Sequence, residues 1–237
     1  MSEPRPAQRV RRLAIEALSV AAGVLLAFSV DAWWERVQER DILEGLRSAA
    51  EVEAAENLDL LGRYRVAGDR SLEAGRRLID MIAPEPADVP LDTVLFFMGT
   101  LLSYNAAPLE LAATDRLLAS GDIESLLDPD FHRGLLQLRA RSTGYYDQGV
   151  RFERIHEELV REFGRVAPLA VLSASKDGGL HPQTDFPVDA RTVLSSPGLE
   201  GAVGNLLVWV DNLNTSVDRL VDLSNAVWAP PPPDADP

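Results

Sequence analysis

The sequence predicts an all-α fold in which one N-terminal transmembrane helix continues into an antiparallel helical bundle. Three observations support this prediction. An apolar segment, residues 13–34, lies between a group of arginines and a long charged stretch. Later stretches carry apolar residues at alternating steps of three and four, which is the spacing of a helix packed in a bundle. Asp128-Pro129 is a helix start signal, an N-cap followed by proline at the first helical position.

Residues 13–34 are predicted to form a single membrane span. A helix of 22 residues covers about 33 Å, and the hydrocarbon core of a bilayer is about 30 Å thick. Arginines dominate the preceding arm, whereas the residues after Trp34 have mixed charge. The positive-inside bias therefore predicts a bacterial inner-membrane protein, with residues 1–12 as a cytoplasmic basic arm and residues 35–228 as a periplasmic bundle.

Two alternatives for this segment remain open at the level of sequence. Its uninterrupted apolar core, residues 17–30, has only 14 residues, a length that also suits a buried helix or the apolar region of a signal peptide. Val30-Asp31-Ala32 loosely resembles a signal-peptide cleavage site. An acidic residue inside the segment and a Trp-Trp pair just after this site argue against cleavage.

Four residues of the span form a candidate helix-packing site. Ser19, Gly23 and Ala27 recur at every fourth position, and such a stripe of small residues allows a second membrane helix to approach closely. An alanine-rich span also produces this spacing by chance. Glu16 would be costly if it faced lipid, so it either pairs with a polar group of another membrane helix or extends to the cytoplasmic headgroups. The expected partners are the lipid bilayer and a membrane or periplasmic protein or a second copy of the chain.

Composition narrows the possible functions of the rest of the chain. The net charge is −14 although the N-terminal arm is basic, so the predicted bundle is strongly acidic and should repel nucleic acids. The absence of cysteine excludes disulfides and thiol chemistry.

The elements of the predicted bundle follow from start and stop signals. The first helix should continue to about Ala83, with a break possible near Gly68. Residues 83–90 are rich in proline and predict a loop, after which Asp92 is expected to cap a fully buried helix over residues 93–104. Pro108 should open a short helix that Gly121 closes.

The C-terminal half is predicted to contain two long helices. The first runs from Asp128-Pro129 to about Val166, and the second from Ser196-Pro197 to about Trp228. Between them, residues 168–196 should be irregular, with a short helix near 169–173 or a partner-binding role as alternatives. Residues 229–237 are expected to be a disordered proline-rich tail.

No catalytic motif is present, so we predict neither an enzyme nor a cofactor or metal site. The HEELV sequence at His156 lacks the second histidine that a zinc-protease helix requires. His156 also falls on the apolar face of its helix, which favours a hydrogen-bonded core histidine.

A candidate buried polar cluster consists of Glu53, Asn57, Tyr145 and His156. Glu53 and Asn57 lie one turn apart on the face of the first helix where aliphatic residues are expected, and buried polar groups must find partners. Tyr145 and His156 occupy the corresponding face of the helix that begins at Pro129. The cluster would either fix how the helices pair or form the floor of a small-molecule pocket.

Several of these residues also match a family pattern. They are Glu16, the Gly-Val-Leu-Leu-Ala run at 23–27, Trp33-Trp34 and, more weakly, Glu53, Asn57, LLASGDI at 117–123 and Tyr145-Tyr146. Over about residues 10–150 the chain resembles a family of uncharacterised bacterial single-pass inner-membrane proteins, a domain of unknown function. Asp31 departs from the pattern, where an amide is expected. The resemblance implies an N-terminal anchor and a helical extracytoplasmic domain, and it implies no activity.

The predicted function is an interaction or scaffold module tethered to the membrane. The alternative is a ligand-sensing bundle that resembles chemoreceptor sensor domains. Such a bundle needs a route for its signal back across the membrane, which a partner would have to supply. A stable protein partner would favour the first function, and a bound small molecule the second.

Overall fold

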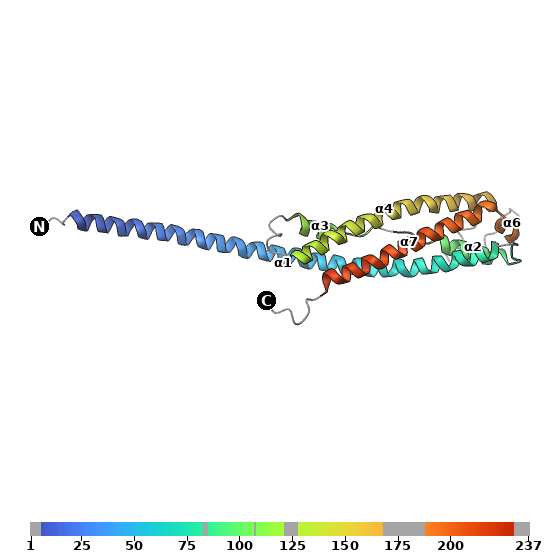
Figure 1. Ribbon diagram of the computed structural model, residues 1–237, viewed down its shortest axis with the longest axis horizontal. Coiled ribbons are helices and arrows are strands. Elements are labelled where there is room, and N and C mark those ends of the chain that lie inside the picture. The colour runs from blue at the N-terminus through green and yellow to red at the C-terminus, as the bar shows by residue number, and fades with distance from the viewer. Residues whose placement is uncertain (1–5, 83–84, 107, 121–127, 168–187, 230–237) are drawn as a thin grey trace. The chain divides into compact units, whose positions relative to one another are not determined.

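The computed structural model describes residues 6–82, 85–106, 108–120, 128–167 and 188–229, with side chains from Leu18 onward. These residues contain helices and no strand, which confirms the predicted all-α class. The helices in chain order are α1 (Pro6–Ile82), α2 (Leu91–Leu102), α3 (Ala112–Ala119), α4 (Pro129–Val166), α6 (Ala190–Leu194) and α7 (Pro197–Trp228) (Figure 1).

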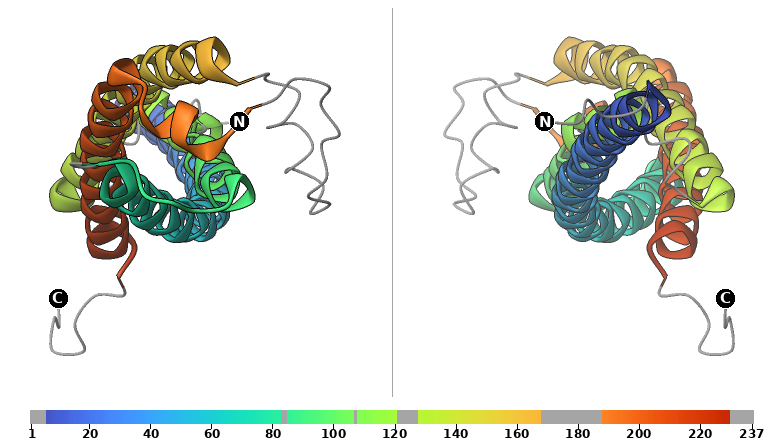
Figure 2. Two further views of the ribbon diagram at one scale, coloured as in Figure 1. Left: turned by 90° about the vertical axis from the view of Figure 1, so that its right-hand side faces the viewer. Right: turned by 90° about the vertical axis from the view of Figure 1, so that its left-hand side faces the viewer.

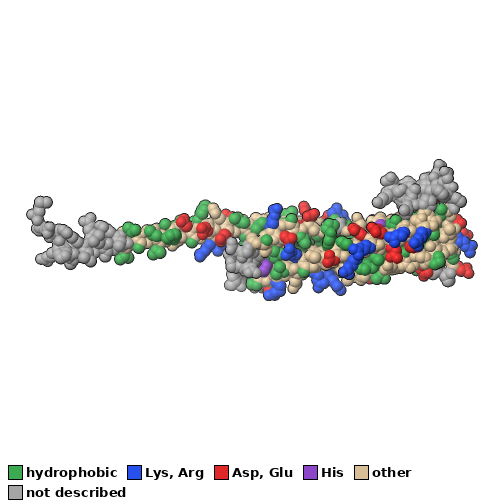
Figure 3. Space-filling view, turned by 90° about the horizontal axis from the view of Figure 1, so that it is seen from above, with side chains coloured by type: hydrophobic (Ala, Val, Ile, Leu, Met, Phe, Trp, Pro, Cys, Tyr) green, Lys and Arg blue, Asp and Glu red, His purple; other side chains and the backbone are tan. Residues whose placement is uncertain are grey.

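The chain divides into two compact units, Met1–Ala49 and Ala50–Pro237, and α1 contributes to both. Among the described residues, α1 is the one helix long and apolar enough to cross a membrane, and none of its apolar window is buried inside the protein. Apolar side chains accordingly gather on the surface of this part of α1 (Figure 3). This exposure argues against the alternative that the segment is the buried helix of a core.

The second unit is organised around α7, which packs against α1 and α4. The residues of α4 and α7 that meet occur in opposite order along the two helices, with Gly134 against Val227 and Gln148 against Ser216. The same holds for α1 and α7, where Gly68 faces Asn214 and Gly75 faces Leu207. Helix α7 therefore runs opposite to both of its neighbours, and the end-on views show the three helices around one interior (Figure 2).

The long helices follow the sequence prediction closely. The Asp128 side chain accepts a hydrogen bond from the backbone N–H of Asp130 at 2.9 Å, so the predicted N-cap of α4 is confirmed. Helix α4 then ends at Val166, and α7 spans Pro197–Trp228. The predicted apolar faces supply core side chains that are fully buried: Leu135, Phe152, Leu159 and Phe163 of α4, and Val203, Leu206, Val210, Leu213, Val217 and Leu220 of α7.

Helix α2 differs from its prediction in two respects. It begins at Leu91, and the backbone N–H of Thr93 donates to the Pro90 carbonyl at 3.0 Å, so Asp92 lies inside the first turn and does not cap it. The helix is also not fully buried, since the Phe96 side chain is 55% exposed. The buried face of α2 is formed by Val94, Leu95, Met98 and Leu101, and Phe96 projects away from it.

The predicted loop regions differ in part as well. Helix α3 begins at Ala112 and not at Pro108. Residues 190–194 of the predicted irregular segment form α6, because the Asp189 side chain accepts from the backbone N–H of Thr192 at 2.6 Å and starts a helical turn. The predicted closing residue Gly121, the alternative helix at 169–173 and the tail beyond Ala229 lie outside the described residues.

Helix α1 continues through Gly68 without a break, because that glycine makes close packing possible. A Cβ atom at this position would overlap the side-chain amide of the buried Asn214 on α7. The missing side chain therefore brings α1 and α7 together, which offsets the low helix propensity of glycine.

We expect alanine to have opposite effects at two helical glycines. Gly68→Ala should lower the free energy of unfolding by about 1–3 kcal/mol, since Asn214 must move in a packed interior. Gly144→Ala on α4 should raise it by up to about 1 kcal/mol, because a Cβ there meets nothing within 4 Å. Denaturant unfolding of the full chain in non-ionic detergent measures both changes. Equal changes at the two positions would contradict the described packing of α1 against α7.

Candidate functional site

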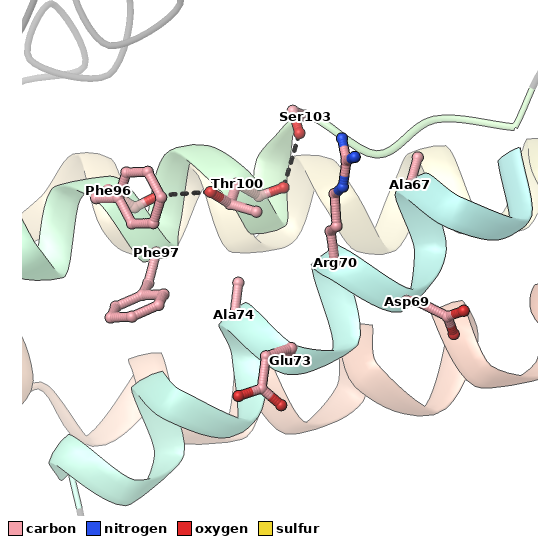
Figure 4. A pocket seen from close by; sticks show the side chains of 9 residues that line it. All are labelled: Ala67, Asp69, Arg70, Glu73, Ala74, Phe96, Phe97, Thr100 and Ser103. Atoms are coloured by element: carbon pink, nitrogen blue, oxygen red, sulfur yellow. Dashed lines mark hydrogen bonds between the residues drawn. The ribbon is translucent and has the colours of Figure 1, made fainter. Parts of the chain in front are cut away.

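A groove of about 680 Å³ lies between α1 and α2 in the second unit (Figure 4). Such a volume is typical of small-molecule pockets, which are mostly apolar with a few polar groups. The side chains that line it are Ala67, Asp69, Arg70, Glu73 and Ala74 of α1 and Phe96, Phe97, Thr100 and Ser103 at α2.

The groove has an apolar floor and one cationic edge. Ala74 and Phe97 face each other across it, and the Arg70 side chain extends toward Ser103 (Figure 4). The carboxylates of Asp69 and Glu73 point away from α2. Both are engaged on α1, Asp69 with Arg65 and Glu73 with Arg77. The groove can therefore accept an apolar group from a ligand or a partner protein.

The predicted polar residues Glu53 and Asn57 hold the segment before α3. The Glu53 carboxylate is 8% exposed and accepts from the backbone N–H groups of Ala113 at 2.7 Å and Thr114 at 3.0 Å, and from the Thr114 hydroxyl at 2.7 Å. The Asn57 amide donates to the Glu110 carbonyl at 2.6 Å and accepts from the Glu110 N–H at 3.1 Å. Glu53 thus supplies from another helix the acceptor that the start of α3 requires.

These contacts correct the prediction that Glu53 and Asn57 pair with Tyr145 or His156. In the described structure the Nε2 atom of His156 lies 2.9 Å from the carbonyl oxygen of Leu102. His156 therefore satisfies the carbonyl of Leu102, the last residue of α2, which has no partner within its own helix. Glu53, Asn57 and His156 each hold a loop or a helix end through a separate contact, and the Tyr145 hydroxyl contacts none of them.

Tyr145 belongs to a buried group of hydroxyls. It is 2% exposed, as is Tyr104, whose ring packs edge-to-face on Phe152 with centroids 5.4 Å apart. Neither tyrosine hydroxyl, nor that of the buried Ser142, has a hydrogen-bond partner among the described residues. Burial raises the pKa of Tyr104 to about 12. Burial is also the main cause that raises the pKa of Tyr145, and the nearby Tyr104 and Tyr64 raise it further.

The predicted membrane-packing residues lie in the first unit. Ser19, Gly23 and Ala27 are exposed and share one face of α1 by their spacing of four. A Cβ atom at Gly23 would meet nothing within 4 Å. The side chain of Glu16 lies outside the described residues.

Within the described ranges, no group of His, Asp or Glu side chains could hold a metal ion. His132 and His156 lie about seven turns apart on α4, and His181 lies outside these ranges.

Sequence reasoning did not find the groove. The run from Val94 to Met98 carried a usable signal, since five consecutive apolar residues cover the whole circumference of a helix and cannot all face one core. No sequence signal pointed to Arg70, because its position at the groove depends on where α2 packs.

No family model matches the chain, and no curated protein or solved structure matches it.

Proposed function

We propose that the protein is a single-pass membrane protein whose helical bundle acts as an interaction or scaffold module. The exposed apolar surface of α1 is the observation that carries this proposal. Leu25 and Phe28 are each 67% exposed and Trp33 is 60% exposed. Water-soluble surfaces rarely carry contiguous apolar patches of more than a few hundred Å², whereas a bilayer removes the cost of exposing these side chains.

The orientation rests on charge. Arginines precede the span, which favours a cytoplasmic N-terminus and a periplasmic bundle in a bacterial inner membrane. The resemblance to the family of single-pass proteins supports the same arrangement. The opposite directions of α7 relative to α1 and α4 support an antiparallel bundle as the exported unit.

The interaction role rests on the groove. Its walls combine apolar atoms with the exposed ring of Phe96, and aromatic side chains are enriched where proteins bind partners. A protein partner that inserts an apolar side chain would cover this ring.

A single substitution tests the anchor. Leu25→Arg places a charge at the middle of the span, where it is strongly unfavourable in a membrane. We expect the variant to move from the membrane fraction to the soluble or aggregated fraction, and protease added to spheroplasts to cleave the wild-type bundle.

Val52→Arg is the matched control, since Val52 is also an exposed apolar residue, at 58%, but lies outside the span. This variant should stay in the membrane fraction. A wild-type chain in the soluble fraction, or a mature protein that begins near Trp33, would contradict the anchor.

A ligand-sensing bundle is the second candidate, and the size and apolar floor of the groove favour it. Purification of the full chain in mild detergent separates the two. A stoichiometric protein partner lost in Phe96→Asp supports the scaffold, and a small molecule lost in the same variant supports the sensor.

A further inference from the structure

A second cavity, of about 220 Å³, lies between α4 and α7, away from the groove. Arg141 and Gly144 of α4 line it together with Ser216 and Arg219 of α7. One water molecule occupies about 30 Å³ of the liquid, so the cavity has room for a small polyatomic ligand.

The antiparallel register places the two arginines opposite each other. Gly134 meets Val227 at one end, and the Ser216 hydroxyl donates to Gln148 Oε1 at 2.8 Å at the other. Arg141 lies midway between Gly134 and Gln148, so it faces the turn of α7 that contains Arg219. Like charges on facing positions repel each other unless an opposite charge separates them.

No carboxylate relieves this repulsion within the described part of the chain. None of the residues that line the cavity is acidic, and neither Arg141 nor Arg219 forms an ion pair there. On α4, Arg133, Arg139 and Arg165 form ion pairs, with Asp130, Asp115 and Glu162, whereas Arg141 and Arg151 form none with a described residue. Arg141 and Arg219 are both exposed, and what distinguishes them is that they line one cavity whose lining holds no acid.

The wall of the cavity leaves space beside Gly144. A Cβ atom at Gly144 would meet nothing within 4 Å, so the α4 side is open. Tyr145 also lines the cavity, but its buried hydroxyl interacts with Tyr104 and Tyr64, so the two arginines are the groups that would bind a ligand.

We propose that this cavity binds a small dianionic oxyanion of the phosphate type between Arg141 and Arg219. Guanidinium groups match the geometry of phosphate oxygens and bind them with paired, charge-assisted hydrogen bonds. This site goes beyond the interaction role, because it lies between α4 and α7 and needs neither the anchor nor the groove. The phosphate group could be a free ion or a lipid phosphomonoester headgroup.

Calorimetric titration of the full chain in non-ionic detergent tests the proposal in two arms. The first arm adds inorganic phosphate, and the second adds micelles that contain short-chain phosphatidic acid. Saturable binding is expected in at least one arm, and the arm in which it occurs identifies the source. Arg141→Gln and Arg219→Gln should each weaken it about tenfold or more, since each removes charge-assisted hydrogen bonds.

Two further variants make the result specific. Arg151→Gln removes an exposed arginine of α4 that does not line the cavity, and it should bind as the wild type does. Gly144→Leu should block binding while the bundle stays folded, because the added side chain enters open space. The proposal is overturned if the wild type shows no saturable binding in either arm, or if Arg141→Gln and Arg219→Gln bind as tightly as Arg151→Gln.

Discussion

Replacing Glu53 by alanine is expected to lower the free energy of unfolding by about 3 kcal/mol or more. The carboxylate accepts two backbone N–H groups and one hydroxyl at the start of α3. Each buried donor that loses its acceptor costs about 1–3 kcal/mol. Denaturant unfolding of the full chain in non-ionic detergent, followed by helical circular dichroism, measures the loss.

Two variants separate the capping contact from the general effect of removing a charge. Glu53→Gln retains one oxygen acceptor and should lose about half as much stability. Glu56→Ala removes an exposed carboxylate from the same helix, and such surface changes usually stay within about 0.5 kcal/mol. If Glu53→Ala and Glu56→Ala behaved alike, the contact between α1 and the start of α3 would not hold this part of the fold.

The long helices were predictable because their signals are local. Asp128-Pro129 and Ser196-Pro197 each mark a start within two residues, and the apolar spacing then continues for several turns. These signals do not depend on what the helix packs against. The long apolar helix at the N-terminus was predictable for the same reason, since its apolar residues are contiguous in the chain.

The candidate sites were less predictable because they depend on contacts between distant residues. Glu53 was correctly placed among the buried polar residues, but its partners lie 60 positions away in a segment whose start signal, Pro108, is misleading. From the sequence, Gly68 suggested a possible break in the first helix. The structure shows that this glycine lets the Asn214 side chain of α7 pack against α1. The facing of Arg141 and Arg219 likewise requires the register of α4 against α7.

Raising the pH above about 10 is expected to destabilise the bundle through its buried tyrosines. An unfolded tyrosine titrates near pH 10, whereas burial raises the pKa of Tyr104 to about 12 and also raises that of Tyr145. Between these values the unfolded chain binds fewer protons than the folded chain, so the free energy of unfolding falls as the pH rises. The stability is fully present below about pH 10. At about 1.4 kcal/mol per pH unit, Tyr104 alone accounts for a loss of about 2 kcal/mol by pH 12.

Conservative variants assign this loss to the buried hydroxyls. Tyr104→Phe and Tyr145→Phe should each reduce the alkaline slope of the unfolding free energy, whereas Tyr146→Phe, at a residue that is 52% exposed, should not. At neutral pH the first two should be close to neutral in stability, because the hydroxyl they remove has no hydrogen-bond partner among the described residues. A large loss at neutral pH would instead show that these hydroxyls are hydrogen-bonded inside the bundle, and an unchanged alkaline slope would show that they reach solvent.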